Sequence, residues 1–170
     1  HAPESRIWGD KTPLNTLYLD WIGSVYPKSK FIHIIRDGRD VADSYLRMKR
    51  YQKLEEAARR WNTSINLAQS FGSKRGDDYM EMRYEELVTD TEPVIRKACS
   101  FLGIDYSPSM LDHTSRVDKL GDTDKAHHSN LTKPINSESV GKWKKNFSDS
   151  EQKEVNRLLR QNLLSLGYVD

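Results

Sequence analysis

Residues 30–45 read KFIHIIRDGRDVADSY, and this stretch decides the fold class of the chain. Residues 31–35 form a short, continuous apolar run rich in branched side chains, which is typical of a strand buried on both faces of a parallel sheet. Helical spacing follows directly, with apolar residues at positions 41, 42, 45 and 46. The stretch therefore predicts a buried strand followed at once by a helix that begins near Asp40.

The rest of the chain continues this alternation of strands and helices. Apolar spacing predicts helices over residues 13–25, 54–70 and 91–102 and after Ser148, and the run YMEMRY at 79–84 predicts a second strand. Local signals mark several ends: Thr12 as an N-cap, Gly103 and Gly167 after helix ends, and Ser148 with Glu151 as a capping box. Residues 105–141 show no sustained period and predict a long loop. We expect an α/β fold in which helices flank a parallel sheet.

Composition limits the class of protein and its compartment. The chain has 170 residues, of which 36% are apolar and 31% charged, which suits a single folded domain. Its net charge of +2 suits an anionic ligand without requiring nucleic acid. The one cysteine, Cys99, allows no intrachain disulfide and is expected to be a buried thiol. Without a signal peptide or an apolar stretch that could span a bilayer, the sequence predicts a cytoplasmic protein with no membrane partner.

The charge after the first strand predicts an anion site. In open parallel sheets, ligands lie beyond the carboxyl ends of the strands, where Arg36 stands. Backbone N–H groups of the next helix point to the same place, and Ser44 lies one turn in, with its side chain leaning back toward the helix start. An alternative stays open, in which Arg36 and Arg39 merely pair with the aspartates at 37, 40 and 43.

The same stretch resembles the 3′-phosphate-binding segment of sulfotransferases that use 3′-phosphoadenosine 5′-phosphosulfate (PAPS). That segment is a strand followed by R-D-x-R-D and by a serine eight positions after the first arginine, the spacing of Arg36 and Ser44. Further stretches resemble the family in the same order: WGDKTP at 8–13, MRYEELVTDTEPVIRKACSFLGI at 82–104, TKPINSESVGKW at 132–143 and LLSLGY at 163–168. The resemblance runs nearly end to end and is closest to bacterial and tyrosylprotein sulfotransferases.

The resemblance implies a set of nucleotide contacts. Arg36 and Ser44 would hold the 3′-phosphate of PAPS, and Tyr84 would contact the nucleotide. Lys133 and Lys142 fall in a loop that folds over the nucleotide in the family. Without the resemblance, Tyr84 is equally well a half-buried tyrosine at a strand end, and both lysines are solvated.

Three further residues match catalytic positions of the family. Lys11 matches a lysine that neutralises charge on the transferring sulfuryl group and its leaving phosphate; by itself it is a surface residue. His127 falls where the tyrosylprotein enzymes place a serine that stabilises the transition state, and Ser129 could take that role after a small shift. Met48 occupies a position that is basic in several relatives, although Arg47 and Lys49 lie beside it. We expect no metal site, because no cysteine lies near His127.

The implied activity is in-line transfer of a sulfuryl group from PAPS to a hydroxyl or amine acceptor, with 3′,5′-adenosine diphosphate (PAP) as product. Two alternatives stay open: a non-catalytic adenine-nucleotide-binding or interaction module, and a nucleotide kinase-like protein. The absence of a G-x-x-x-x-G-K-[ST] motif counts against the kinase-like protein.

One part of the family pattern is not found in the sequence. Such sulfotransferases begin with a strand, a glycine- and serine-containing loop that grips the 5′-phosphosulfate, and a helix, and no similar motif precedes Trp8. We therefore expect an N-terminally truncated sulfotransferase fold of the P-loop-NTPase type. Residues 1–170 would form a single domain, equal to the C-terminal two-thirds of the family's domain, that associates with a missing N-terminal segment.

Overall fold

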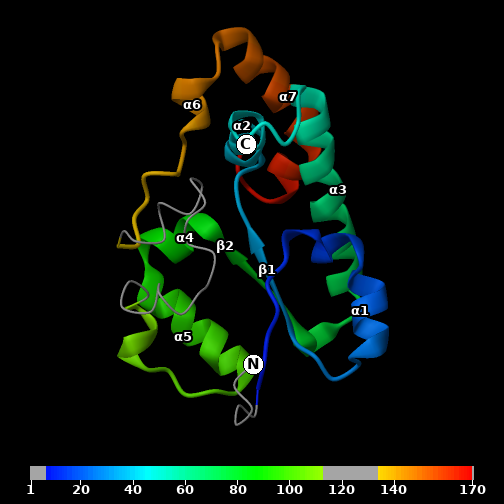
Figure 1. The fold of residues 1–170 in the computed structure, drawn as a ribbon, viewed down its shortest axis with the longest axis vertical. Helices are drawn as coiled ribbons and strands as arrows, with labels where there is room; N and C mark the ends of the chain where they lie inside the picture. Colours follow the sequence, from blue (N-terminus) through cyan, green and yellow to red (C-terminus); the bar gives the residue numbers. More distant parts are fainter. Residues whose placement is uncertain (1–6, 113–133, 170) are drawn as a thin grey trace.

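The computed structural model describes residues 7–112 and 134–169 of the chain. Two strands and a larger number of helices make up the described part (Figure 1). In chain order the elements are η1 (Pro13–Leu17), α1 (Leu19–Val25), β1 (Phe31–Ile35), α2 (Gly38–Arg47), α3 (Leu54–Gly72), η2 (Gly76–Asp78), β2 (Tyr79–Arg83), α4 (Tyr84–Thr89), α5 (Thr91–Leu102), η3 (Pro108–Met110), α6 (Trp143–Asn146) and α7 (Asp149–Ser165), where η marks a 3₁₀ helix.

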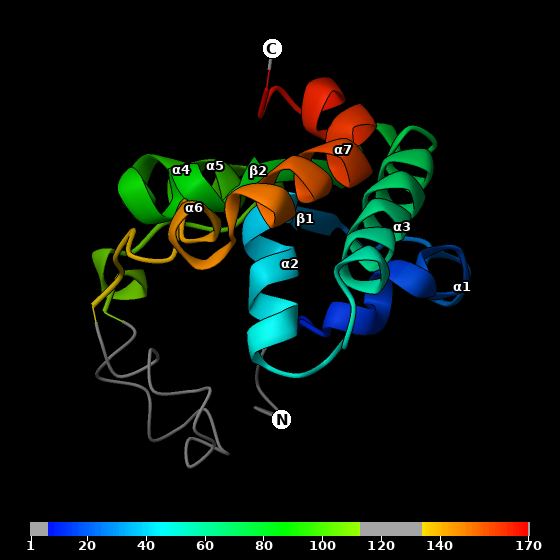
Figure 2. The ribbon, with the colours of Figure 1, turned by 90° about the horizontal axis from the view of Figure 1, so that it is seen from above.

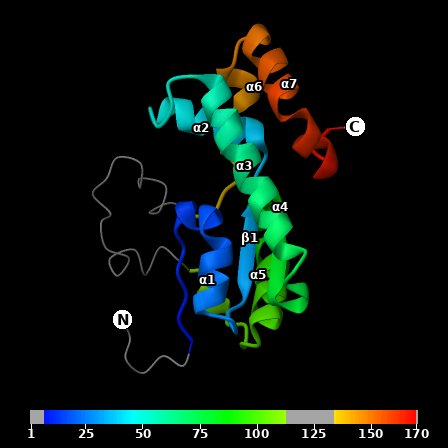
Figure 3. The same cartoon turned by 90° about the vertical axis from the view of Figure 1, so that its right-hand side faces the viewer.

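The strands β1 and β2 pair in parallel, in a register that runs from Phe31 opposite Tyr79 to Ile35 opposite Arg83. Helices α4 and α5 lie on one side of the strands, and α1 and α3 lie on the other (Figures 1 and 3). This arrangement confirms the predicted α/β class with a parallel sheet flanked by helices. It also brings the carboxyl ends of both strands to the same edge, beside the start of α2.

The prediction that the first strand is buried on both faces is wrong. Ile35 is buried, but Ile34 on the opposite face is 48% exposed, and the remaining residues of β1 are half-buried. Within the described residues β1 pairs only with β2. The apolar residues of α5 pack on Met80 and Met82 of β2 and on Ile32, and this cover does not extend to Ile34.

The first predicted helix is divided in two. Residues 13–17 form the 3₁₀ helix η1, and α1 begins only at Leu19. Thr12 does not cap the helix through its side chain; its hydroxyl donates to Asp10 at 3.2 Å, and Asn15 donates to the other oxygen of Asp10 at 2.6 Å. These local side-chain bonds fold the segment into a tight turn that competes with a regular α-helix.

The other predicted helices are confirmed, several of them with their ends. Gly103 follows α5 in the left-handed conformation at φ 70°, and Ser148 and Glu151 form the capping box of α7. Helix α2 begins at Gly38, two residues before the expected position near Asp40. The short helix α6 was not predicted, and it follows directly on the expected loop.

The main core lies at the α2 end of the molecule. Helix α7 packs across α2 and α3 (Figure 2), and its inward side chains Val155, Leu159 and Leu163 are fully buried. Trp61 of α3 and Trp143 of α6 belong to the same cluster. This core therefore fixes the corner at which β1 ends and α2 begins. Cys99 is buried as predicted, and no helix in the described ranges is long and apolar enough to cross a membrane.

Candidate functional site

The corner between β1 and α2 is built around a close glycine–tryptophan contact. The indole Nε1 of Trp61 donates to the backbone oxygen of Arg36 at 3.1 Å. The Trp61 ring covers Gly38, where an added Cβ would lie 2.6 Å from the ring. Only glycine therefore fits at this point of the R-D-G-R-D run, and the tryptophan holds the turn from strand to helix.

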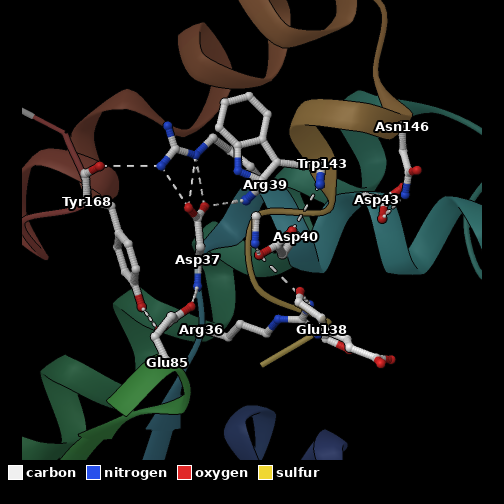
Figure 4. A network of polar contacts seen from close by, with 12 residues as sticks. Arg36, Asp37, Arg39, Asp40, Asp43, Glu85, Glu138, Trp143, Asn146 and Tyr168 are labelled. Atoms are coloured by element: carbon white, nitrogen blue, oxygen red, sulfur yellow. Dashed lines mark hydrogen bonds and ion pairs between the residues drawn. The ribbon is translucent and has the colours of Figure 1, made fainter. Parts of the chain in front are cut away.

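Arg39 and Asp37 form a buried ion pair (Figure 4). The Arg39 Nη2 lies 2.7 Å from Asp37 Oδ2, and the two side chains are 10% and 11% exposed. The Arg39 guanidinium also lies over the Trp143 ring at 4.4 Å and donates to Asn156 and to the backbone oxygen of Tyr168. The alternative reading of the corner, an arginine paired with neighbouring acids, thus holds for Arg39.

The start of α2 offers fewer free N–H groups than the sequence predicted. The Asp37 carboxylate accepts from the backbone N–H of Arg39 at 2.9 Å and caps the helix. The backbone N–H of Asp37 itself donates to Glu85 at 2.9 Å. Carboxylates of the protein therefore already occupy these two donors.

Arg36 has a different environment from Arg39. Its guanidinium lies over the Tyr84 ring at 4.8 Å, and its Nη2 donates to the backbone oxygen of Ser139. The nearest ion-pair contact is Asp40 Oδ2 at 3.9 Å, too long for a hydrogen bond. The Nε of Arg36 is buried without a hydrogen-bond partner among the described residues. Arg36 therefore has an N–H donor without a partner among the described residues, whereas Arg39 uses its donors within the protein.

Ser44 lies farther along α2 than expected. Because α2 begins at Gly38, Ser44 is in its second turn, where it is half-buried. Its hydroxyl donates to the sulfur of Met48 at 3.6 Å. A thioether is a weak acceptor, so this hydroxyl can exchange the contact for a stronger one. No hydrogen bond joins Ser44 directly to Arg36 in the described part of the chain.

The structure brings two other predicted residues to this corner. Tyr84 is the first residue of α4 rather than the last of a strand, and the Arg36 guanidinium lies over its ring. Lys142 directly precedes α6, half-buried, between two residues whose backbone N–H groups donate to Asp40. The nucleotide-binding roles of Arg36, Ser44, Tyr84 and Lys142 stay predictions.

Of the remaining predicted residues, Lys11 alone lies in the described part of the chain. Lys11 is exposed in the segment before η1. Lys133, Ser129 and His127 lie outside the described residues. Within the described ranges, no group of three or more His, Cys, Asp or Glu residues is arranged to hold a metal ion.

The sequence did not predict that Glu85 links Asp37 to Tyr168 through hydrogen bonds. Glu85 accepts from the Asp37 N–H through one carboxylate oxygen and from the Tyr168 hydroxyl through the other, both at 2.9 Å. Burial first, and then the Glu85 carboxylate, raise the pKa of Tyr168 above its usual value. The tyrosine therefore stays protonated and keeps its donor. Glu85 and Tyr168 both lie in stretches that carry the family resemblance, which is the signal that could have found them.

Comparison with known proteins identifies the class of protein to which this chain belongs. A family model described as "Sulfotransferase family" matches residues 1–108. The chain belongs to the sulfotransferase family, as its sequence predicted.

Individual relatives agree with this assignment. The protein-tyrosine sulfotransferase 1 of Danio rerio is 24% identical over 178 residues, which cover 99% of this chain and 50% of that protein. The 3-beta-hydroxysteroid sulfotransferase of Cavia porcellus is 25% identical over 191 residues, covering 97% of this chain and 65% of that protein. The solved sulfotransferase domain from the Synechococcus PCC 7002 olefin synthase is 26% identical, with a TM-score of 0.73 over 89% of this chain and 56% of that one. The chain spans about half the length of the first of these relatives.

Proposed function

We propose that this chain supplies the 3′-phosphate-binding part of a sulfotransferase that transfers a sulfuryl group from PAPS to an acceptor and releases PAP. The relatives' names include a protein-tyrosine and a hydroxysteroid sulfotransferase. Both names point to a hydroxyl group, which supports a hydroxyl acceptor over an amine. Neither the relatives nor the described residues favour the non-catalytic alternative.

The environment of Arg36 carries this proposal. A buried donor without a partner costs about 1–3 kcal/mol, and an anion that accepts from it removes this cost. The Arg36 Nε is such a donor, at the carboxyl end of a parallel strand, where ligands of open α/β sheets bind. A guanidinium is also the side chain whose planar donors best match the oxygens of a phosphate.

The other predicted residues complete the proposed site. Ser44 would donate its hydroxyl to the same 3′-phosphate, and the Tyr84 ring would hold the Arg36 guanidinium in place while contacting the nucleotide. Lys142 and Lys133 would add positive charge from the C-terminal side. Lys11 would neutralise the leaving phosphate, with Ser129 or His127 stabilising the sulfuryl group in the transition state.

Positioning and charge stabilisation would carry most of the rate. In the transfer, the bond from sulfur to the bridging oxygen of the phosphosulfate would break, and the acceptor hydroxyl would give its proton to a general base as its oxygen forms the new bond to sulfur. Negative charge grows on the leaving phosphate, so fixed cations there lower the barrier. Binding the ribose 3′-phosphate at Arg36 contributes by holding the donor in one orientation.

Calorimetric titration with two nucleotides tests the proposal. The chain is titrated with 3′,5′-adenosine diphosphate and with 5′-AMP, which lacks the 3′-phosphate. We expect tighter binding of the diphosphate, and Arg36→Ala should weaken it by about 1.5–3 kcal/mol, the usual size for hydrogen bonds to charged groups. Arg96→Ala is the matched control, because Arg96 pairs with Glu92 on the exposed face of α5. Equal affinities of the unmutated chain for both nucleotides would refute the proposal.

A further inference from the structure

Asp40 is a fully buried carboxylate whose bonds cross from α2 to the C-terminal segment. Its side chain is 0% exposed. Its Oδ2 accepts from the backbone N–H of Gly141 at 2.7 Å, and its Oδ1 accepts from the backbone N–H of Trp143 at 3.0 Å (Figure 4). A buried charge is stable only when such donors compensate it, so the carboxylate holds both amides firmly.

The segment 139–143, which Asp40 binds through two backbone amides, also contains the backbone oxygen that accepts a hydrogen bond from Arg36. The backbone oxygen of Ser139, two residues before Gly141, accepts from the Arg36 Nη2. Gly141 has φ 72°, in the left-handed region that favours glycine, so the chain turns sharply between Ser139 and Trp143. Asp40 itself lies 3.9 Å from the same Nη2 and attracts the guanidinium.

Asp40 therefore acts on Arg36 in two ways. It places the Ser139 oxygen that fixes one end of the guanidinium, and its charge holds the guanidinium toward the corner. The Tyr84 ring at 4.8 Å supports the guanidinium plane. Lys142 lies between the two amides that Asp40 binds, so the same carboxylate also fixes the backbone of this lysine.

We propose that Asp40 is a positioning residue, which sets the Arg36 guanidinium and the segment 139–143 for recognition of a ribose 3′-phosphate. This inference rests on the proposed function. Asp40 makes no contact with the nucleotide itself, because its carboxylate is buried and both oxygens are occupied. A carboxylate is needed, because the amide nitrogen of an asparagine would face one of the two backbone N–H groups and leave it unpaired.

The test measures discrimination, defined as the Kd for 5′-AMP divided by the Kd for 3′,5′-adenosine diphosphate. It is measured well below the melting temperature of each variant, so that every variant is folded. We expect Asp40→Asn to lower the discrimination about tenfold, a coupling within the range seen for residues in one hydrogen-bond network. A purely structural role would lower the melting temperature and leave this ratio unchanged.

Asp43→Asn is the matched control for Asp40→Asn. Asp43 is also buried on α2 and also bonds to the C-terminal side, since it accepts from the Asn146 side chain at 2.9 Å. Its other partner is Arg47, and no hydrogen bond or ion pair joins Asp43 to Arg36 or to residues 139–143. We expect this variant to keep the discrimination of the unmutated chain.

If Asp40→Asn does not fold, the variants Gly141→Ala and Gly103→Ala replace it in the test. Gly141 and Gly103 have nearly the same φ, 72° and 70°, and an added Cβ would have open space at both. Alanine therefore introduces similar backbone strain at each position. Gly141→Ala shifts the amide that Asp40 binds and should lower the discrimination, while Gly103→Ala, at the end of α5, should leave it unchanged.

The outcomes separate this inference from the proposed function. If the unmutated chain shows no discrimination, the proposed function fails and the inference with it. If the chain discriminates and Arg36→Ala abolishes this, but Asp40→Asn and Gly141→Ala keep it, only the inference is overturned. In the Arg36→Ala background, Asp40→Asn should cause no further loss of discrimination. An equal loss in both backgrounds would show that Asp40 does not act through Arg36.

Discussion

Charged side chains at the start of α2 have separate roles because their surroundings differ. Arg39 lies among Asp37, Trp143 and the Tyr168 carbonyl, so its donors are used within the protein. Arg36, three residues earlier, meets a ring and one carbonyl, and no carboxylate of the described residues is hydrogen-bonded to it. Two arginines of one short motif thus separate into a structural residue and a candidate ligand-binding residue.

Gly38→Ala tests the packing that holds this corner. The new methyl group would lie 2.6 Å from the Trp61 ring, which is itself 5% exposed and cannot move into solvent without loss. We expect the free energy of unfolding to fall by about 1–3 kcal/mol, the usual cost of overpacking. Urea unfolding measures it, with Gly9→Ala as control, because an added Cβ at Gly9 meets nothing within 4 Å. If Gly38→Ala and Gly9→Ala were equally stable, the close packing of Trp61 on Gly38 would be wrong.

His33 is expected to make stability depend on pH. Burial is the larger effect and lowers the pKa of His33 below 6.5, while the neighbouring Glu81 opposes it. The Tyr79 hydroxyl lies 2.8 Å from Nδ1 and donates to Glu81 Oε1 at 3.1 Å, so the buried imidazole belongs to a small hydrogen-bonded group. Between the folded pKa and 6.5 the unfolded chain binds more protons, so stability is complete above 6.5 and falls as the pH drops toward the folded value.

The His33 effect is measured as a difference between two proteins. The free energy of unfolding of the unmutated chain, minus that of His33→Gln, is followed from about pH 7.5 to about pH 5, the range in which imidazole titrates. The subtraction removes the contribution of the other histidines. We expect the difference to decrease toward acid pH. A difference that stays constant, or grows, would show that the folded chain does not disfavour the imidazolium.

At the scale of elements, the ends of α5 and α7 could be predicted because their signals are local. A glycine after the last apolar residue of α5 and a Ser-x-x-Glu run before α7 act through the backbone next to them. The break between η1 and α1 could not be predicted, because Asp10 competes for the same turn. Helix α6 is one turn long, and Asp40, about a hundred residues earlier, binds the backbone at its start.

Ser148→Ala tests the capping box of α7. The Ser148 hydroxyl accepts from the Glu151 N–H, and the Glu151 carboxylate accepts from the Ser148 N–H at 2.8 Å. Loss of the cap should lower the free energy of unfolding by about 1 kcal/mol. Ser70→Ala, at an exposed position within α3, is the control and should change stability by only a few tenths of a kcal/mol. Denaturant unfolding compares the two, and equal losses would mean that the cap contributes nothing.

Across the whole molecule, the sequence predicted the fold class but not the long-range hydrogen bonds at the corner between β1 and α2. Arg36 and Ser44 could be proposed from their spacing because both lie in one strand–helix corner, whereas Tyr84 comes from the separate stretch 82–104 that resembles the family. The burial of Asp40 and the separate roles of the two arginines depend on segments about a hundred residues away. The exposure of Ile34 likewise depends on which elements cover the sheet, which an apolar run alone does not specify.

The described residues also expose many apolar side chains in the segment before β1. Eight exposed apolar or aromatic side chains come from one short region: Ile7, Trp8, Leu14, Leu17, Tyr18, Trp21, Val25 and Tyr26. Trp8 packs edge-on against Tyr26, which joins the two ends of this region. Exposed patches of this kind promote association.

We expect the chain to self-associate as its concentration rises, and Trp21→Lys to reduce this. Trp21 is 66% exposed, so the substitution removes apolar surface with little loss of packing. Sedimentation velocity over a concentration series measures the effect. Leu164→Lys, which places the same charge at a 40% exposed position on α7, is the control and should leave association unchanged. A concentration-independent sedimentation coefficient for the unmutated chain would contradict the expectation.

A crystal structure of the chain with bound 3′,5′-adenosine diphosphate tests the central claim most directly. We expect the 3′-phosphate within hydrogen-bond distance of the Arg36 guanidinium and of the Ser44 hydroxyl, with Ser44 released from Met48 and Arg39 still paired with Asp37. If the 3′-phosphate instead lies away from this corner, with Arg36 bound only to the Ser139 oxygen, the proposed recognition of a ribose phosphate at the end of β1 is wrong.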